Sequence, residues 1–509
     1  MRLVTATLLV LASLAWLAQG YRILSINASP SRSHVIVQEA LAKELARRGH
    51  QVTMVSPYPA KPLENYRQIV VPLDSYWKAT MAKFMEDQSK MALFKNMPKM
   101  NEIMLDAANN TINHPEVQRI IQEEPFDLFI TGLMSDFVLG VAYQLGVPSV
   151  VVCPNAAMEM VNSMVGNPAP LATVPNPMVG VTNAMTFTNR LKNLLGKVIE
   201  SGFTWYMQTS SEQYYYSNFP RDQFPSYDEV RRNVSLVLIN QYFTKTAARP
   251  YVQAMVEVGG LQIKPVPDPL PADLQEWLDE ARDGVIFFSM GTNLQSSTIP
   301  AEKLQALVST FGKLKQRIIW KWDSKDIPNK PANILLRSWL PQDDILAHKN
   351  VRLFITHGGL GGIAEAQYHG VPLVGMPMFG DQPHNMERVK DEGWALVVPF
   401  AELTEPVLTD AVNEVLHNSS YAKKVRELSE LYRDRPLSAM DTAVFWTEYV
   451  IRHKGARHMR YSGVDLNFVQ LNMLDVWAFL GIVVLVSVKV TMWMCLKCCG
   501  KRNSKYKMN

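Results

Sequence analysis

The sequence predicts an α/β protein with two doubly wound, Rossmann-like domains and a C-terminal transmembrane helix. At 509 residues the chain is too long for a single hydrophobic core. Short apolar strands alternate with amphipathic helices in two separate series, which is typical of parallel sheets covered by helices. A proline-rich stretch, Lys264–Pro271 (KPVPDPLP), separates the two series, and Leu474–Leu496 is apolar over a length that spans a bilayer.

The first series begins with a βαβ unit. The strand Arg22–Asn27 is followed by a helix over His34–Arg48, capped by Ser33, and by the strand Gln51–Ser56. Strands joined through a helix are parallel, so we expect a parallel sheet with helices on its faces. Two more strands continue this series: Asp127–Thr131 and Val147–Cys153.

The second series follows the proline-rich stretch. Two halves of this kind joined by a linker imply a cleft, and ligands of doubly wound domains bind at the carboxyl ends of the strands. The expected strands are Gly284–Ser289, Arg317–Lys321, Asn333–Leu336, Val351–Thr356, Val371–Met376 and Ala395–Val398. Candidate ligand-binding residues should therefore lie just after these strands.

Both ends of the chain carry membrane-related signals. Residues 1–20 combine a basic residue, an apolar core and a small-x-small cleavage site, which predicts a secretory signal peptide. Residues 497–509 are basic without an acidic residue, and the positive-inside rule places them in the cytosol. The predicted parts are a signal peptide (1–20), an N-terminal domain (21–263), a linker (264–283), a C-terminal domain (284–455), a membrane-proximal segment (456–473), a transmembrane helix (474–496) and a cytosolic tail (497–509).

The charge balance excludes nucleic acid as a partner. The formal net charge is +4, but five positive charges lie in the tail, so the rest of the chain carries −1. A body without excess basic charge has no face that neutralises a phosphate backbone. Of the four cysteines, only Cys153 lies away from the border of the predicted membrane segment, so no intramolecular disulfide is expected in the body.

A glycine-rich stretch follows the strand Val351–Thr356 and reads THGGLGGIAEA. Within it, Gly359–Ala364 satisfies the G-x-G-x-x-A pattern of dinucleotide-binding proteins. That pattern belongs at the first βα turn of a domain, whereas this stretch follows a late strand. The acidic residue that would hold a ribose should end the next strand, but Asp381 lies well past it. A nicotinamide-dependent oxidoreductase is therefore the weaker of two interpretations.

A longer spaced pattern supports the other interpretation. It consists of Trp339-Leu340-Pro341-Gln342, Thr356-His357-Gly358-Gly359, Glu365, and Asp381-Gln382. This pattern resembles the signature of the UDP-glycosyltransferases, and the membrane-bound, glucuronosyltransferase-like branch is the most similar. The resemblance covers essentially the whole chain. It implies two Rossmann-like domains of the GT-B type, with the acceptor bound by the N-terminal domain and the UDP-sugar by the C-terminal domain.

The resemblance assigns donor-binding roles to residues of the C-terminal half. Trp339 offers a flat face on which uracil stacks, Gln342 an amide for the edge of the base, and Glu365 resembles the ribose-binding carboxylate. Unpaired N–H groups at a helix start and the helix dipole favour a diphosphate. The residues expected around the diphosphate are Gly291, Thr292, His357, Gly358, Gly359, Gly361 and Gly362, and the pair expected at the transferred sugar is Asp381 and Gln382. Vertebrate relatives carry an asparagine at the position of Gly361, so the choice between glucose and glucuronic acid stays open.

His34 is the predicted catalytic base. It follows a strand and starts a helix, where the dipole keeps an imidazole neutral, and this placement resembles the catalytic histidine of the family. Many relatives place an aspartate after the strand equivalent to Asp127–Thr131, but that position here is Gly132. Either Asp136, four residues later, orients His34, or His34 works without a carboxylate and Asp136 caps the next helix.

The resemblance implies transfer of a hexose or hexuronic acid to a hydroxyl group with inversion at the anomeric carbon. UDP-sugar is then a co-substrate and no further cofactor is needed. The chain contains no Asp-x-Asp pair, so no metal is expected, and the helix start with His357 would stabilise the leaving diphosphate. Residues 60–120 and 155–230 are helical insertions rich in methionine and aromatic residues, which suit a small lipophilic alcohol or phenol as acceptor.

The last residues predict where the protein resides. Lys505 and Lys507 resemble a dilysine retrieval signal, so we expect a single-pass type I protein of the endoplasmic reticulum membrane with its body in the lumen. Glycosylation sequons begin at Asn27, Asn109, Asn233 and Asn418. The lipid bilayer is thus an expected partner, and a homo-oligomer stays open. The rival to a transferase, besides the oxidoreductase, is an inactive relative that binds lipophiles or UDP-sugars, which the glycine at 132 favours.

Overall fold

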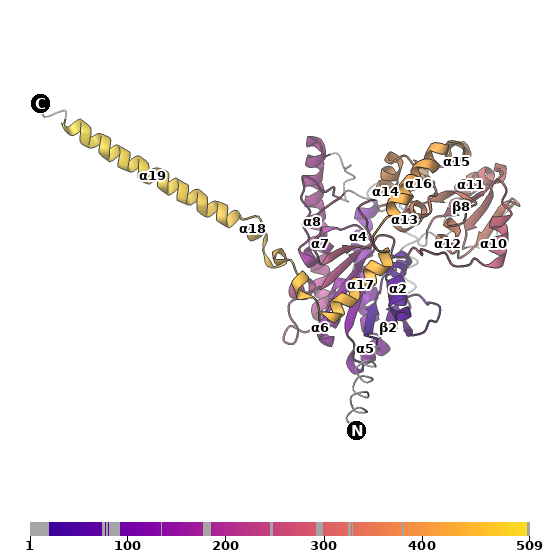
Figure 1. The fold of residues 1–509 in the computed structure, drawn as a ribbon, viewed down its shortest axis with the longest axis horizontal. Coiled ribbons are helices and arrows are strands. Elements are labelled where there is room, and N and C mark those ends of the chain that lie inside the picture. The colour runs from indigo at the N-terminus through magenta and orange to yellow at the C-terminus, as the bar shows by residue number, and fades with distance from the viewer. Residues whose placement is uncertain are drawn as a thin grey trace, which may run out of the picture. The chain divides into compact units, whose positions relative to one another are not determined.

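Two parallel β-sheets carry the fold of the body of the chain (Figure 1). The structure is a computed structural model that describes residues 20–73, 77, 80, 92–133, 135–176, 185–244, 248–291, 299–323, 327, 329–378 and 381–505. The chain divides into a body, Met1–Arg460, and a C-terminal part, Tyr461–Asn509. Of the predicted signal peptide, only Gly20 lies among the described residues.

Within the described residues the first sheet has seven parallel strands in the order β3-β2-β1-β4-β5-β6-β7. They are β1 (Arg22–Ile26), β2 (Gln51–Ser56), β3 (Tyr66–Val70), β4 (Leu128–Gly132), β5 (Ser149–Cys153), β6 (Leu236–Ile239) and β7 (Met255–Glu257). In β1, Ile23 lies opposite Val52 of β2 and Leu128 of β4. The strand order reverses between β1 and β4, and such a reversal leaves a crevice at the carboxyl ends of the two strands.

The second sheet, counted over the described part of the chain, has six parallel strands in the order β10-β9-β8-β11-β12-β13. They are β8 (Val285–Ser289), β9 (Arg317–Lys321), β10 (Ile334–Arg337), β11 (Val351–Thr356), β12 (Leu373–Gly375) and β13 (Ala395–Val397). Its order reverses between β8 and β11, so a second crevice lies at the ends of these strands.

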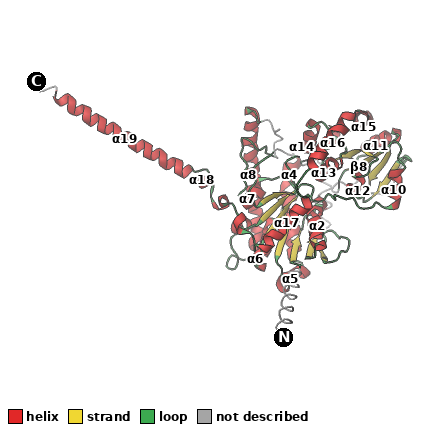
Figure 2. Ribbon diagram, viewed as in Figure 1, coloured by secondary structure: helices red, strands yellow, loops and turns green. Residues whose placement is uncertain are grey.

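Helices cover both faces of each sheet (Figure 2). Those between the strands of the first sheet are α2 (Arg32–Arg47), α4 (Ala92–Ile112), α5 (Pro115–Glu123), η1 (Asp136–Leu139), α6 (Gly140–Leu145), α7 (Glu159–Val165), α8 (Phe187–Asn218) and α9 (Tyr227–Arg232). Those of the second half are α10 (Ala272–Asp279), α11 (Ala301–Lys313), α12 (Gln342–Leu346), α13 (Leu360–His369), α14 (Gln382–Asp391), η3 (Phe400–Glu402), α15 (Glu405–His417) and α16 (Ser419–Arg433).

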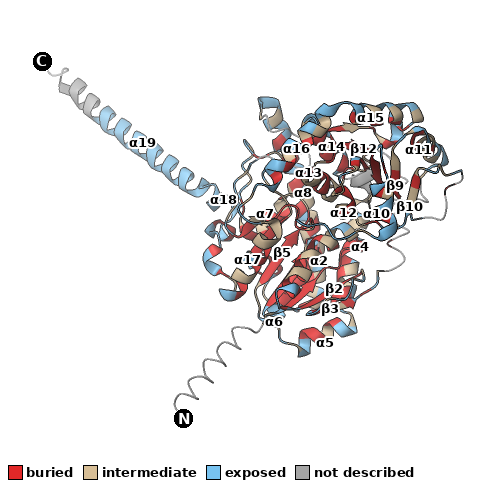
Figure 3. Ribbon diagram, turned by 45° about the vertical axis from the view of Figure 1, so that its right-hand side comes forward, coloured by how far each residue is buried: buried red, intermediate tan, exposed pale blue. Residues whose placement is uncertain are grey.

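Successive residues of each strand enter different hydrophobic cores, because side chains of a strand point to opposite faces. In β1, Ile23 packs with residues of α2 on one face, and Leu24 packs with residues of α4 and α5 on the other. In β8, Ile286 and Phe287 divide between two cores in the same way. The central strands are therefore buried on both faces (Figure 3), which explains why their sequences are largely apolar rather than alternating.

The predicted strands are all present, with ends within one or two residues, but the structure adds three. β6 and β7 precede the linker, where no strand was expected. β3 (YRQIV) lies in the region 60–120, whose prediction as wholly helical is therefore wrong: an edge strand with polar residues lacks the apolar run that marks a buried strand. The predicted cap of α2 is also wrong, because Ser31 rather than Ser33 precedes the helix.

The last helix of the body, α17 (Ala439–Arg452), packs against the first sheet. Val444 and Val450 join the core beside α2, and Arg48 at the end of α2 forms an ion pair with Asp441. This differs from the predicted C-terminal domain (284–455), because α17 finds the partner for its apolar face on the N-terminal half of the chain. The chain thus crosses back to the first sheet before it reaches the C-terminal part.

The C-terminal part consists of the 3-10 turn η5 (Ser462–Asp465), the short helix α18 (Phe468–Leu471) and the long helix α19 (Leu474–Lys505). One stretch of α19, Leu474–Lys497, is long and apolar enough to cross a membrane, and none of it is buried. The predicted transmembrane helix (474–496) falls within this stretch. Of the dilysine pair, Lys507 lies outside the described residues.

Candidate active site

Several of the predicted site residues lie at the two points where the strand order reverses. In the first sheet, β1 leads into the loop that carries Asn27 and reaches His34 in α2, and β4 ends at Gly132. In the second sheet, β8 leads into Gly291 and β11 leads into His357. The carboxyl ends of strands at such reversals form the ligand crevice of doubly wound sheets. The structure therefore places both sets of residues where a ligand would bind.

His357 is held between two glycines. A Cβ atom added at Gly291 would lie 2.6 Å from the His357 ring, and one added at Gly359 would lie 2.7 Å from it. Gly291 and Gly358 have φ angles of +82° and +86°, which L side chains rarely adopt. Gly359 is the N-cap of α13, whose first-turn N–H groups have no acceptor within the helix. Glycine at these positions therefore brings the imidazole and the helix start together.

Sequence reasoning missed Lys321, which ends β9 beside these glycines. Its amino group donates a hydrogen bond to the carbonyl oxygen of Gly291. Burial lowers the pKa of Lys321, and burial together with the positive charge of Lys321 lowers the pKa of His357 to about 4. A neutral imidazole and a lysine thus lie where the diphosphate is expected. The sequence signal that could have identified Lys321 is its position as a basic residue at the carboxyl end of the apolar strand RIIWK. The predicted Thr292, next to Gly291, lies outside the described residues.

Gln342 and Glu365, the residues predicted for the base edge and the ribose, contact each other. Gln342 Nε2 donates to Glu365 Oε2 at 2.6 Å, and Gln262 Nε2 donates to Glu365 Oε1 at 3.4 Å. Gly362 lies over Gln342, whose Nε2 would be 3.3 Å from an added Cβ. At Gly361 an added Cβ would meet only Gln262 Nε2, at 3.7 Å, so packing leaves room for a side chain there. Gln262, from the region before the linker, was not predicted.

Trp339 lies between β10 and α12 and is 51% exposed. The guanidinium carbon of Arg32, the first residue of α2, is 4.2 Å from the centroid of the Trp339 ring. Lys321 Nζ is 5.9 Å from the same centroid. Trp339 is thus a half-exposed ring with Arg32 over it and Lys321 nearby, and this positive charge suits an anionic ligand such as a nucleotide. The contact with Arg32 also joins the predicted donor side to the helix that carries His34.

Asp381 and Gln382, the predicted sugar-binding pair, lie in different surroundings. Asp381 is exposed, and its carboxylate accepts a hydrogen bond of 2.7 Å from Asn385 Nδ2. Asn385 Nδ2 also donates to the carbonyl oxygen of Gly358 at 3.1 Å, which ties α14 to the glycine-rich turn. Gln382 is buried and its Oε1 accepts from the backbone N–H of Met378 at 3.0 Å. Asp381 therefore faces solvent at the edge of the site, whereas Gln382 organises its own loop.

On the acceptor side, His34 is the third residue of α2 and is partly buried. Its Nδ1 lies 3.4 Å from Ser29 Oγ, and its backbone carbonyl oxygen accepts from Asn27 Nδ2 at 3.4 Å. Burial lowers the pKa of His34 to about 4. The imidazole is therefore neutral at pH 7, which is the form that can accept a proton. Asn27 is only 4% exposed and engaged in this network, so its sequon is not available for glycosylation.

Neutral amides fill the position where relatives are expected to carry an aspartate. A Cβ atom added at Gly132 would lie 2.9 Å from Asn27 Nδ2 and 3.2 Å from Gln38 Oε1. Asn27 and Gln38 hydrogen-bond each other at 2.9 Å, and Gln38 Nε2 donates to Ser25 Oγ at 2.9 Å. The local chain is packed around a glycine, and a larger residue at 132 would displace the amide pair.

Asp136 has a different partner from the one considered in the sequence analysis. Its Oδ2 accepts from Arg231 Nε at 2.6 Å and its Oδ1 accepts from Tyr227 Oη at 2.7 Å, all three residues being buried. The pKa of Tyr227 is raised by burial and by the adjacent carboxylate. A carboxylate that turned to His34 would leave a buried guanidinium unpaired, which is unfavourable. The hypothesis that Asp136 orients His34 is corrected accordingly: Asp136 is a structural ion-pair partner.

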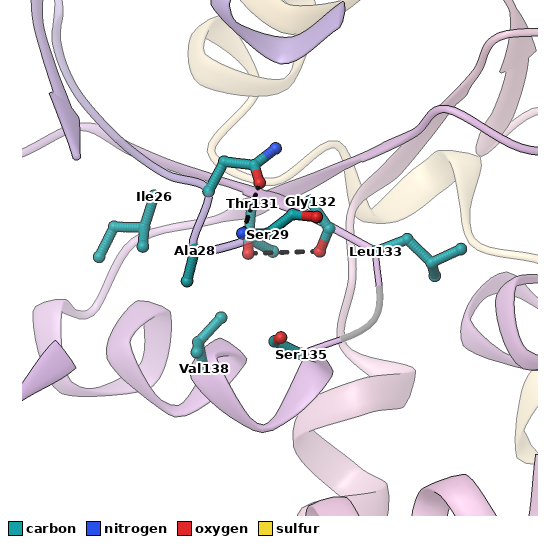
Figure 4. Close-up of a pocket in the computed structure, with 9 residues that line it drawn as sticks. Ile26, Ala28, Ser29, Thr131, Gly132, Leu133, Ser135 and Val138 are labelled. Atoms are coloured by element: carbon teal, nitrogen blue, oxygen red, sulfur yellow. Dashed lines mark hydrogen bonds between the residues drawn. The ribbon is translucent and has the colours of Figure 1, made fainter. Parts of the chain in front are cut away.

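A small hollow lies at the carboxyl ends of β1 and β4 (Figure 4). Ser29 borders it, and its backbone N–H donates to Asn27 Oδ1 at 3.1 Å. The walls come from the ends of β1 and β4 and from η1, not from the insertions 60–120 and 155–230. The lining residues are Ile26, Asn27, Ala28, Ser29, Thr131, Gly132, Leu133, Ser135 and Val138. Its walls combine apolar side chains with the hydroxyl groups of Ser29, Thr131 and Ser135.

Comparison with known proteins agrees with this arrangement. A sequence model of the family described as "UDP-glucoronosyl and UDP-glucosyl transferase" matches residues 22–508. The chain is 34% identical to "UDP-glycosyltransferase UGT5" of Dactylopius coccus, with 94% of this chain and 92% of the relative aligned. It is 33% identical to "UDP-glucuronosyltransferase 2C1" of Oryctolagus cuniculus, with 92% of this chain and 95% of that protein aligned.

Solved structures show the same fold at low sequence identity. The calicheamicin glycosyltransferase CalG4 has a TM-score of 0.53 at 18% identity and covers 86% of this chain and 99% of its own. A UDP-glucosyltransferase from Polygonum tinctorium has a TM-score of 0.54 at 16% identity and covers 85% of this chain and 98% of its own. The two parallel sheets described above are thus those of a GT-B glycosyltransferase.

Proposed function

Because the chain belongs to the family of UDP-glucuronosyl and UDP-glucosyl transferases, we propose that it transfers a hexose or hexuronic acid with inversion to a hydroxyl group of a small lipophilic acceptor. Sugar transfer from a UDP-sugar follows from the family. The observation that carries the finer proposal is the contact between the two sides of the site. Arg32 of the helix that bears His34 lies 4.2 Å from the ring of Trp339. A base and a nucleotide platform therefore border the same crevice.

On the acceptor side, His34 removes the proton of the acceptor hydroxyl group. An alcohol or phenol is a weak nucleophile at pH 7 until a base takes its proton. Ser29 lies against Nδ1, so Nε2 is the nitrogen assigned to receive the proton. The oxygen then forms a bond to the anomeric carbon as the bond from that carbon to the diphosphate breaks, and UDP leaves with the electron pair. One displacement of this kind inverts the anomeric centre.

On the donor side, the departing diphosphate gains negative charge during the reaction. The first turn of α13, His357 and Lys321 supply hydrogen-bond donors and positive potential at this place. These groups support a reaction that needs no metal ion. Trp339 and Gln342 hold the base, Glu365 holds the ribose, and Asp381 reaches the sugar. The described residues of the site show no feature that selects glucose over glucuronic acid, so the donor is proposed only as a class.

The proposed function is tested by turnover with two donors. Solubilised full-length protein is incubated with UDP-glucose or UDP-glucuronate and a panel of phenols and aliphatic alcohols. We expect a β-linked product from the α-linked donor, identified by the anomeric coupling constant in NMR, and the same rate with and without EDTA. An α-linked product would refute inversion, and loss of activity in EDTA that a divalent ion restores would refute a metal-free reaction. Binding of UDP without turnover of any acceptor would favour the inactive relative.

The pH dependence should report a base of low pKa. A protonated imidazole cannot accept a proton, so kcat/KM is expected to fall only as the pH drops through about 4, the pKa of His34, and to stay level between pH 6 and 8. An enzyme whose base kept the ordinary histidine pKa of about 6.5 would already have lost half its activity at a pH of about 6.5. Initial rates measured from pH 4 to 8 distinguish the two, and a half-maximal value near 6.5 would contradict the proposed environment of His34.

The low pKa values of His34 and His357 also make the stability of the protein depend on pH. Between about pH 4 and 6.5 the unfolded chain binds protons on His34 and His357 that the folded chain does not bind. The free energy of unfolding is therefore expected to decrease as the pH falls through this window. Rates at the acidic end should accordingly be taken from short pH jumps, with circular dichroism as the control for folding.

Trp339→Ala tests the nucleotide platform. Loss of base stacking is expected to weaken donor binding by roughly 1–3 kcal/mol, about 5- to 150-fold in KM for the UDP-sugar. The change in kcat should be smaller, because stacking persists from the bound donor to the transition state. Since Trp339 is half exposed, the fold should survive. Trp339→Phe is the matched control and should keep most of the affinity; an unchanged KM in the alanine variant would remove Trp339 from the site.

We also propose the membrane of the endoplasmic reticulum as the location, with the body in the lumen. The apolar stretch Leu474–Lys497 supports anchoring in a membrane. The basic residues that follow support a cytosolic tail. Protease treatment of sealed microsomes tests the orientation: the body should be protected, and a tag after residue 509 should be removed.

A further inference from the structure

The turn that follows β7 brings one polar side chain of the N-terminal half against helix α13. Leu261 and Ile263 are buried, and Gln262 between them is half-buried. Leu261 packs in the core of the first sheet, whereas Ile263 packs in a small cluster with Ala364 of α13. The backbone of Gln262 is therefore fixed on both sides, between the first sheet and the helix that starts after His357.

Asn240, which follows β6, holds the same turn. Its Oδ1 accepts from the backbone N–H of Gly260 at 2.8 Å, and its Nδ2 donates to Gln262 Oε1 at 3.5 Å. Arg435 Nη1 donates to the carbonyl oxygen of Gly259 at 2.9 Å. Because Asn240 occupies the amide oxygen of Gln262, the NH₂ group is the end of this side chain that faces α13.

This NH₂ group lies over the face of α13 that carries Gly361 and Glu365. The two residues are four positions apart, so they share one face of the helix. Gln262 Nε2 donates to Glu365 Oε1 at 3.4 Å and lies 3.7 Å from a Cβ atom added at Gly361. An amide NH₂ group can donate two hydrogen bonds. Among the described residues Glu365 is its one acceptor, so the second N–H is available at the start of α13.

The start of α13 is the place where the diphosphate is proposed to bind. Gly361 is the second residue of the helix, and the N–H groups of the first turn have no acceptor within the helix. An asparagine at 361, as in the vertebrate relatives, would place its amide nitrogen roughly 2.5 Å from its Cβ by standard bond lengths. Gln262 Nε2 borders the space that such an amide would use. Glycine at 361 thus leaves this space to a side chain from the other half of the body.

We propose that Gln262 is a donor-binding residue contributed by the N-terminal half, and that its amide donates a hydrogen bond to the diphosphate of the UDP-sugar in place of a side chain at position 361. The same amide keeps its hydrogen bond to Glu365, so it spans the ribose and diphosphate parts of the donor. This inference rests on the proposed function, because it requires UDP at the start of α13, and it adds a donor contact from the half that carries His34.

Binding of UDP and of uridine to the solubilised full-length protein tests the assignment. Uridine keeps the base and the ribose but lacks the diphosphate. Gln262→Ala is expected to weaken UDP binding about 10-fold or more, the effect of losing one hydrogen bond to a charged group. The affinity for uridine should change much less. Calorimetry gives the affinity for UDP, and displacement of UDP gives that for uridine. Gln305→Ala, at an exposed glutamine of α11, is the matched control and should bind both as the wild type does.

Two further variants separate a lost hydrogen-bond donor from lost packing. Gln262→Met keeps the length of the side chain without the amide and should weaken UDP binding as Gln262→Ala does. Gly361→Asn, added to Gln262→Ala, should restore most of the lost UDP affinity, because the new amide enters the vacated space. Thermal melting followed by circular dichroism shows that each variant is folded.

Four results would overturn the proposal: unchanged UDP affinity in Gln262→Ala, wild-type affinity in Gln262→Met, no recovery with Gly361→Asn, or an equal loss of affinity for UDP and uridine. The last of these would mean that Gln262 only orients Glu365. Wild-type protein that binds neither UDP nor uridine would refute the proposed function itself, and this inference with it.

Discussion

Replacing His34 with alanine is expected to lower kcat by about 10²- to 10⁴-fold, the usual contribution of a positioned general base. The acceptor hydroxyl group then has only water to take its proton. The affinity for UDP should stay unchanged, because the donor contacts come from Trp339, Gln342 and the start of α13. Single-turnover rates and UDP titration by calorimetry, measured on the same preparation, separate these two effects.

Ser29→Ala is the graded control for this experiment. Ser29 Oγ lies 3.4 Å from His34 Nδ1 and holds that side of the ring, so its loss should reduce kcat far less than loss of the ring itself. A His34→Ala enzyme that keeps most of its turnover would reject His34 as the base while leaving the fold and the donor site intact. Weakened UDP binding in that variant would instead indicate that the loop after β1 had moved.

Asp136→Asn is expected to cost about 3–5 kcal/mol of folding free energy, the effect of removing one partner of a buried ion pair. Asp136 and Arg231 have side-chain exposures of 5% and 3%, and the N···O distance is 2.6 Å. The substitution leaves Arg231 charged and buried, and it also weakens the bond from Tyr227. Chemical denaturation of the solubilised protein should show a lower midpoint, with the pH profile of the remaining transfer activity unchanged.

An exposed ion pair provides the comparison. Lys99 and Glu102 are 38% and 52% exposed and lie 2.9 Å apart, so Glu102→Gln should cost less than about 1 kcal/mol. If Asp136→Asn instead kept its stability and lost turnover as His34→Ala does, the structural assignment of Asp136 would be wrong and the orienting role would be restored. Full stability together with full activity would show that the buried pair contributes little.

Much of the fold could be predicted from the sequence because its signals are local. Buried parallel strands such as β1 (RILSI) and β8 (VIFFS) are mostly apolar runs, and glycine precedes the second of them. β3 was not predicted because an edge strand is partly exposed and carries polar residues, as in YRQIV. α17 was assigned to the wrong half because its sequence shows an apolar face but not which sheet that face contacts.

In the candidate site, too, some residues could be predicted from the sequence and others could not. The glycines around His357 were predictable, since a close approach of backbone to a ring requires residues without a side chain. Lys321 and Arg32 were missed, because each reaches the site from a different strand or domain; for Lys321 the local sign was only its position at the end of the apolar strand RIIWK. Thr292 remains a prediction, as do the roles of all residues proposed to bind the donor.

By itself, the sequence determined the two-sheet architecture, the positions of the strand ends and the residues that gather at the donor edge, since apolar periodicity and turn residues act over a few neighbours along the chain. Only the tertiary structure decided which charges are paired. Asp136 lies four residues from Gly132 in sequence, yet its partner is Arg231, 95 residues away. A buried ion without a counter-ion is strongly destabilising, and the residue that supplies the counter-ion can be distant in the sequence.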